Sequence, residues 1–210
     1  MISLFGRSST RNRSGTKYGY TALFPIKDTD SSVELRKILE IMGSHERGSP
    51  FADVPLIHMA RLIVWDNLPY QGYPAKTDRL KSSYLIFMCD FDGSQVGELA
   101  GSLVQNAPDL VNDVWGKCSN FPYSSSAMTG DTADRLTDYF TRYQVETSLF
   151  LSDRPDTTVG EILRSINLQV AFARFVERNQ TATAKTLKSK FRTFWQKQKK
   201  TNQPVPGGLP

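Results

Sequence analysis

The stretch SSYLIFMCDFDGS, residues 82–94, constrains the fold of this 210-residue chain more than any other segment. In an extended strand its large side chains alternate between two faces, with Leu85, Phe87, Cys89 and Phe91 on one and Tyr84, Ile86 and Met88 on the other. A strand that is apolar on both faces needs cover on both sides. It then runs directly into Asp90, Asp92 and Gly93, and the two carboxylates need either ionic partners or a ligand.

The hydrophobic periodicity of the whole chain predicts an ordered series of strands and helices. Alternating apolar residues predict strands over 18–27, 56–65, 84–92 and 146–152. Apolar spacings of three and four predict helices over 28–43, from Ser94 to Pro108, over 107–118 and 132–145, and a long final helix beginning near 159. A βαββαβ series packs as a four-stranded antiparallel sheet with helices on one face, so the predicted fold class is α+β, ferredoxin-like.

The sheet face without helices must be covered as well. Because the second and third predicted strands are apolar on both faces, the sheet needs a second layer. We expect another copy of the chain to supply it by packing sheet to sheet, which predicts a homodimer or a higher homo-oligomer.

Charge is unevenly distributed along a chain of formal net charge +5. Residues 1–17 and 181–210 carry eleven basic residues and no acidic one, which leaves 15 basic and 21 acidic residues between them. This argues against one broad nucleic-acid-binding face and places any polyanion contact in the ends. We predict a basic flexible arm over 1–17, a domain over 18–180, a basic amphipathic helix over 181–200 and a flexible Pro/Gly tail over 201–210.

Cysteine usage and the lack of a long apolar run indicate the compartment. Cys89 and Cys118 are too few for a disulfide framework, and Cys89 lies in an apolar strand, so we expect a reduced, buried thiol there. The opening segment MISLFGRSSTRNRSG holds no signal-peptide core, and no apolar run in the sequence is long enough to cross a bilayer. The protein is therefore expected to be soluble and cytoplasmic.

Four polar residues of the second and third strands are candidate ligand-binding groups: His58, Arg61, Asp90 and Asp92. In a structural interpretation, which we favour, Arg61 pairs with Asp90 or Asp92 while Gly93 and Ser94 turn the chain and cap the next helix. In a functional interpretation the same side chains line a substrate pocket. The strand period of two places His58 and Arg61 on opposite faces unless a β-bulge intervenes.

Motifs for other chemistry are absent from the sequence. There is no Cys-x-x-Cys or His-x-x-x-His spacing for a metal, and no glycine-rich nucleotide loop. Serines 124–126 lie outside any nucleophile elbow. Asp66, Asp90 and Asp92 could gather at a hard cation, but surface acids are the commoner explanation, so no metal site is predicted.

Several segments resemble a group of uncharacterised bacterial proteins with the dimeric α+β-barrel fold. The order and spacing of TALFPIK, LRKIL, IHMARLIVW and YLIFMCDFDGS carry this resemblance, and DLVNDVWGKCSNFP and TVGEILRSINLQVAFARFV are similar to that group as well. The resemblance covers about 20–180 and implies a ferredoxin-like unit that dimerises into a barrel. The same fold also houses dye-decolourising peroxidases and chlorite dismutases, although a shared fold does not transfer function.

Haem binding is the activity that these distant relatives suggest. Their haem iron is bound by a histidine from the C-terminal half, whereas this chain has only His45 and His58. The distal acid of the peroxidases lies in a Gly-x-x-Asp-Gly motif. Asp92-Gly93 matches its last two positions, but Cys89 or Asp90 stands where the motif has glycine. We therefore expect neither haem nor another cofactor.

The predicted C-terminal helix combines an apolar stripe with many cations. Such a helix can pack on the body or across a dimer, dock in a partner's groove, lie on an anionic membrane or contact nucleic acid. We expect the packed or partner-docked arrangement. The residues that would bind a partner or a polyanion are Lys188, Phe191, Arg192, Phe194, Trp195, Lys199 and Lys200.

Two functions follow from these observations. The resemblance and the polar strand ends favour a small-molecule-handling dimeric α+β-barrel protein, accessory to oxidative or lipid-related metabolism, with His58, Arg61, Asp90 and Asp92 at its site. The alternative is a non-enzymatic binding or assembly protein that acts through its C-terminal helix on a partner protein, an anionic membrane or nucleic acid. No catalytic motif identifies a reaction.

Overall fold

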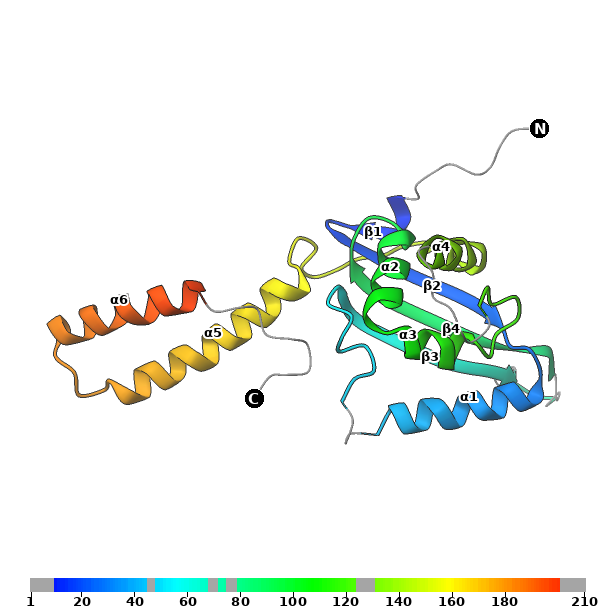
Figure 1. Cartoon of the computed structure of the whole chain (residues 1–210), viewed down its shortest axis with the longest axis horizontal. Helices are drawn as coiled ribbons and strands as arrows, with labels where there is room; N and C mark the ends of the chain where they lie inside the picture. Colours follow the sequence, from blue (N-terminus) through cyan, green and yellow to red (C-terminus); the bar gives the residue numbers. More distant parts are fainter. Residues whose placement is uncertain (1–9, 45–47, 68–71, 75–78, 124–130, 201–210) are drawn as a thin grey trace.

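A computed structural model describes residues 10–44, 48–67, 72–74, 79–123 and 131–200 of the chain. His45, most of the predicted N-terminal arm and the tail 201–210 lie outside these residues. Figure 1 shows the elements: η1 (Thr10–Asn12), β1 (Arg13–Ser14), β2 (Lys17–Pro25), α1 (Thr29–Met42), β3 (Ile57–Asn67), β4 (Arg79–Asp92), α2 (Val96–Asn106), α3 (Pro108–Trp115), α4 (Thr132–Tyr143), α5 (Val159–Arg178) and α6 (Ala184–Lys200).

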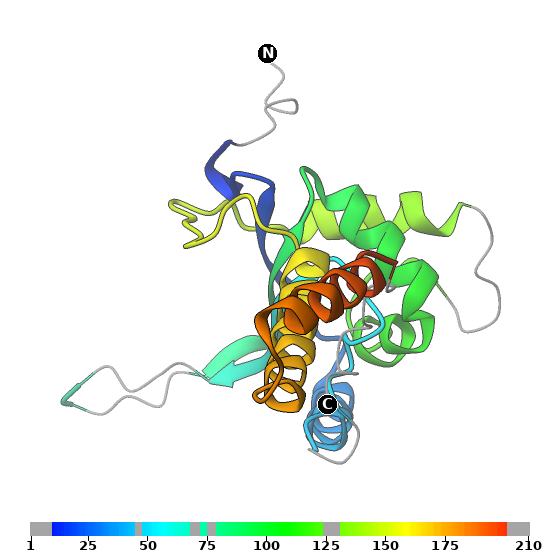
Figure 2. The same cartoon turned by 90° about the vertical axis from the view of Figure 1, so that its left-hand side faces the viewer.

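The predicted α+β class is confirmed, since the strands form a four-stranded antiparallel sheet in the order β1-β2-β4-β3. The two-faced apolar strand β4 lies in the interior of this sheet, between β2 and β3. Helices α1 to α4 all lie on one side of the sheet, which is seen well in Figure 2.

The predicted fourth strand over 146–152 is wrong, because this segment forms no strand. It follows the outer edge of β2, with an isolated bridge between Ala22 and Gln144. The ring of Phe150 lies against Gly19, where an added Cβ would come within 2.7 Å of it. Hydrogen bonds to side chains replace the backbone hydrogen bonds of a β-ladder in this segment. The amide of Thr147 donates to Asn12 Oδ1 (2.8 Å), and the amide of Ser152 donates to Ser14 Oγ (3.2 Å).

The core lies between the sheet and helices α1 to α4 and is rich in aromatic side chains. Phe87, at the middle of β4, has no exposed surface, and its ring centroid is 5.0 Å from that of Trp115 and 5.8 Å from that of Tyr20. Phe24 and Phe140 complete the group and are also fully buried. Edge-to-face and offset contacts of this kind add stability beyond the area that they bury.

Local side-chain bonds determine where the helices begin. Asp28 caps α1 by accepting the Ser31 amide at 2.7 Å, and Thr158 forms a capping box with Glu161 at the start of α5. The expected cap at Ser94 is wrong. Gln95 occupies the N-cap of α2 without a side-chain bond, while Ser94 donates its amide and its hydroxyl to Glu98.

The face of the sheet opposite the helices, called the open face below, is apolar and partly exposed. Met59 and Ile63 of β3 are 58% and 38% exposed, and Ile86 and Met88 of β4 are half-buried beside them. None of the helices α1 to α4 covers this face (Figure 2). That a second layer covers this face stays a prediction.

Strand β3 forms one edge of the described sheet and is irregular at both ends. Its register with β4 shifts between Ile57 and Met59 and again between Trp65 and Asn67. Arg36 of α1 reaches this edge, donating to the Val64 carbonyl (3.1 Å) and pairing with Asp66 (2.7 Å).

Helices α5 and α6 form a hairpin that extends away from the body (Figure 1). Phe172 and Phe175 of α5 pack against Phe191 and Phe194 of α6, with ring centroids 4.8 to 6.5 Å apart. The apolar stripe predicted for the C-terminal helix thus packs on α5, the last helix within the predicted domain over 18–180. Within the described part of the chain, every helix is too short or too polar to span a bilayer.

Replacing Phe87 with alanine is expected to lower the free energy of unfolding by about 3–5 kcal/mol, because it opens a cavity among rigid rings. Denaturant titration measures the loss. The matched control is Phe172→Ala on α5, where the side chain is 46% exposed and the loss should be far smaller. Equal losses in the two variants would contradict this assignment of the core.

Candidate functional site

A group of polar side chains gathers at one end of the open face, where β4 ends. Four residues form it and are called the polar cluster below: Lys17, His58, Asp90 and Asp92. Antiparallel pairing places Lys17 of β2 directly beside Asp92 of β4, and Asp90 beside Met59 of β3. The cluster includes three of the four site residues predicted from the sequence.

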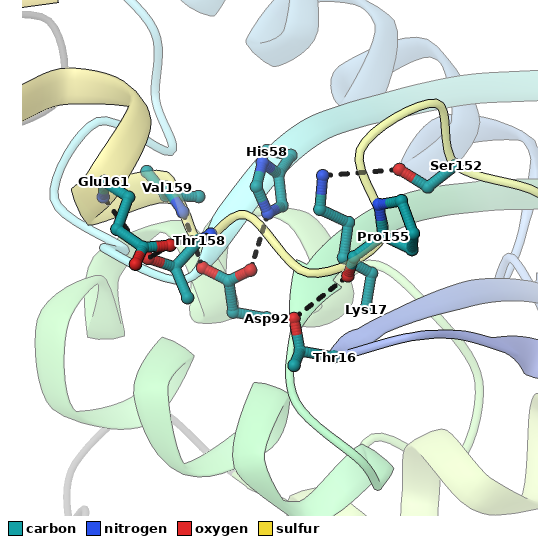
Figure 3. A network of polar contacts seen from close by, with 9 residues as sticks. All are labelled: Thr16, Lys17, His58, Asp92, Ser152, Pro155, Thr158, Val159 and Glu161. Atoms are coloured by element: carbon teal, nitrogen blue, oxygen red, sulfur yellow. Dashed lines mark hydrogen bonds and ion pairs between the residues drawn. The ribbon is translucent and has the colours of Figure 1, made fainter. Parts of the chain in front are cut away.

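Both oxygens of the Asp92 carboxylate are bound (Figure 3). Oδ1 lies 2.6 Å from His58 Nε2, and Oδ2 accepts the backbone N–H of Val159 at 2.7 Å. The side chains of His58 and Asp92 are only 14% and 18% exposed. Because Val159 is the first residue of α5, the carboxylate also lies at the positive end of the helix dipole.

The β-bulge between Ile57 and Met59 explains how His58 reaches Asp92. The extra residue of a bulge changes the side of the sheet to which a side chain points. The expected ion pair between Arg61 and Asp90 or Asp92 is wrong. Arg61 is exposed and forms no ion pair within the described residues, since His58 has taken the place beside Asp92.

The bond to Asp92 sets the chemistry of His58. When Nε2 carries the proton that Asp92 accepts, Nδ1 presents a lone pair and can accept a hydrogen bond or a proton. A carboxylate held on one ring nitrogen also fixes the plane of the imidazole. In this neutral tautomer His58 is an oriented acceptor.

Lys17 is a buried cation that the sequence did not point to as a site residue. It is only 6% exposed, and its Nζ donates to the Ser152 hydroxyl at 3.3 Å. The loop that carries Ser152 is fixed nearby, because Thr16 donates its amide and its hydroxyl to the Pro155 carbonyl at 3.0 and 3.1 Å. The sequence could have pointed to Lys17 as a charged residue that continues the alternation of the first strand. The predicted strand, however, began at residue 18, so Lys17 was assigned to the N-terminal arm.

Asp90 differs from Asp92 in having no hydrogen bond or ion pair to the part of the chain that the structure describes. Partial burial raises its pKa, while the charges of His58 and Lys17 act in the opposite direction. Asp90 is therefore a carboxyl group that takes up a proton more readily than an exposed aspartate.

The remaining reactive groups are shielded. Cys89 is free and buried, as predicted, and Cys118 is free and buried as well. Burial raises the pKa of the Cys118 thiol to about 12. Burial likewise raises the pKa of Cys89, so neither thiol is activated as a nucleophile. Among the residues that the structure describes, no group of three or more His, Cys, Asp and Glu side chains could hold a metal ion.

Comparison with protein-family models, with curated proteins and with solved structures gives no match for this chain. What the polar cluster can do therefore follows from its own chemistry. It offers a cation at Lys17, an oriented acceptor at His58 and a protonatable group at Asp90, beside the apolar side chains of Met59 and Met88. Such a set suits a small molecule with a polar head and an apolar body.

Asp92→Ala should lower the free energy of unfolding by about 2–3 kcal/mol, because it leaves the partly buried His58 and the first amide of α5 without their acceptor. Hydrogen exchange at residues 159–163 should accelerate more than elsewhere. Asp153→Ala, which removes an exposed carboxylate, is the control. Unchanged exchange at the start of α5 would refute this role of Asp92.

Asp90→Asn should make the protein more stable at neutral pH. Since the pKa of Asp90 is higher in the folded than in the unfolded chain, the folded state binds the proton more tightly. The Asp90 side chain therefore stabilises the folded protein at pH values below its pKa in the unfolded chain. This stabilisation is lost as the pH rises through the pKa of Asp90 in the folded protein. The gain in melting temperature of Asp90→Asn should therefore grow between pH 4 and pH 7, and a pH-independent difference would contradict it.

Proposed function

We propose that the protein binds and handles a small molecule at the polar cluster, in a site that is closed by dimerisation. The observation that carries the proposal is Asp90, a partly buried carboxyl group without a partner in the described residues, beside a buried lysine and an oriented histidine. Groups left unpaired at the end of an apolar face are typical of ligand sites, where the ligand supplies the missing bonds.

The proposed architecture is a ferredoxin-like unit that pairs into a dimeric α+β barrel. Two observations support it. Strand β4 lies between β2 and β3, so that the third long strand separates the first two, and Gln144 and Val145, just before the predicted fourth strand, bond to the outer edge of β2. A second copy on the open face would cover Met59 and Ile63 and turn the polar cluster into an enclosed pocket.

Arg61 has a distinct place in this proposal. It is an exposed cation on the open face, one strand away from the cluster, and it has no ion pair within the described residues. A guanidinium at the wall of an enclosed pocket would bind the polar head of a ligand.

Native mass spectrometry of the freshly purified protein tests assembly and ligand together. We expect a dimer that carries additional mass, and we expect Asp90→Asn and Arg61→Gln to remain dimeric while losing that mass. Lys37→Gln, an exposed change on α1, is the control for Arg61→Gln. A monomer without ligand would overturn the proposal.

Ile63→Glu should convert the proposed dimer to a monomer, because it places a charge on the apolar open face. Light scattering at micromolar concentration measures the change. Val33→Glu is the matched control, since Val33 is 49% exposed on α1, away from the open face. If both variants keep the mass of the wild type, the open face is not the dimer interface.

A further inference from the structure

The α5–α6 hairpin exposes more apolar surface than the packing of its two helices requires. Five large side chains along it are 38–46% exposed: Phe172, Val176, Leu187, Phe191 and Trp195. Between the helices runs an open groove of about 350 Å³, lined mainly by Leu168, Phe172, Phe191, Phe194 and Trp195. A contiguous apolar surface of this kind marks a binding face.

Charge separates the hairpin from the rest of the molecule. Residues 159–200 carry ten basic and two acidic residues, a net charge of +8, whereas residues 10–158 carry 15 basic and 19 acidic residues, a net charge of −4. Helix α6 has no acidic residue at all. This charge favours an anionic occupant for the groove face.

Cations border the apolar side chains of α6. On a helix, residues three, four and seven positions apart share one side, so Lys188, Arg192 and Lys199 lie next to Trp195. Long basic side chains in this position keep their charge at a polar boundary while their methylene stems extend the apolar surface. An aromatic ring at the same level is typical of side chains at a lipid–water interface.

Two other occupants fit these observations less well. A second hairpin would bring two charges of +8 together, so self-association into a four-helix bundle is opposed by repulsion. The bases of a nucleic acid could stack on Phe191 and Trp195, but they form no comparable contact with the aliphatic Val176 and Leu187. Lipid hydrocarbon packs against aromatic and aliphatic side chains alike.

We propose that the α5–α6 hairpin binds the surface of an anionic phospholipid bilayer. The hairpin lies in the plane of the interface, with Phe191 and Trp195 among the upper acyl chains and the basic residues of α6 at the phosphates. The hairpin extends from the body, so that a planar surface reaches it without meeting the helices α1 to α4 (Figure 1). The negative body is repelled by the same surface, which orients the molecule. This inference does not depend on the ligand of the open face.

Co-sedimentation of the full chain with vesicles tests the proposal. Vesicles that mix phosphatidylcholine and phosphatidylglycerol in a molar ratio of about two to one should bind the protein. Pure phosphatidylcholine should bind it at least tenfold more weakly, and molar NaCl should weaken binding to the anionic vesicles. The fluorescence emission of Trp195 should shift to shorter wavelength on binding. Subtracting the spectrum of Trp195→Phe isolates this signal from that of the other two tryptophans. No binding to the anionic vesicles, or equal binding to both kinds, would overturn the proposal.

Paired variants separate the two contributions. Lys188→Gln with Lys199→Gln should weaken binding at least tenfold, while Lys37→Gln with Arg142→Gln, which removes the same charge from the body, should leave it within twofold. Phe191→Gln with Trp195→Gln keeps the charge and should also weaken binding at least tenfold, with circular dichroism checking that the helices persist. Vesicle binding that the hairpin variants leave unchanged would refute the proposal. So would tighter binding to a single-stranded oligonucleotide than to vesicles that present the same amount of negative charge.

Discussion

The carboxylate of Asp92 joins the three parts of the molecule on which its organisation depends. It ends the central strand β4, holds His58 of the edge strand β3 and accepts the first amide of α5. One group thereby satisfies a histidine and a helix start that would otherwise be buried without partners. The direction in which the hairpin leaves the body is determined at this point, since α5 begins there. Asp92 is thus a structural residue as well as a member of the polar cluster.

The two acidic residues at the end of β4 have different roles because their surroundings differ. Asp92 is fully bound, while Asp90, two residues earlier on the same face, has no partner in the described chain. Burial therefore acts on Asp90 without compensation by a hydrogen bond and raises its pKa. The same local sequence thus supplies one residue that fixes the fold and one that is available for chemistry.

The sequence predicted the central part of this fold from simple periodicity, and it failed where neighbouring segments compete. Strand β4 was predictable because both of its faces are apolar. The segment 146–152 also alternates but forms no strand, because the side chains of Asn12 and Ser14 accept two amides that a ladder would use. Its Leu149 and Leu151 are 72% and 76% exposed. The position of His58 depends on a bulge, which no alternation rule locates.

The C-terminal helix was predicted correctly as amphipathic, but the sequence did not identify the side of α5 on which it packs. Helix α5 carries one apolar stripe through Leu163, Ile166 and Val170, and a second, on another side, through Phe172 and Phe175. The sequence drew attention to the first stripe, whereas α6 packs on the second. Periodicity identifies an apolar face, and only the three-dimensional arrangement shows which of two faces is used.

The irregular edge of β3 has a consequence for how copies of the chain can meet. An edge strand of eleven residues could pair with the same strand of another molecule and extend the sheet indefinitely. Here register shifts interrupt the edge at both ends, and Arg36 occupies the carbonyl of Val64 with its guanidinium. Growth into fibres through this edge is thereby discouraged, whereas the proposed pairing of two open faces would close after two copies.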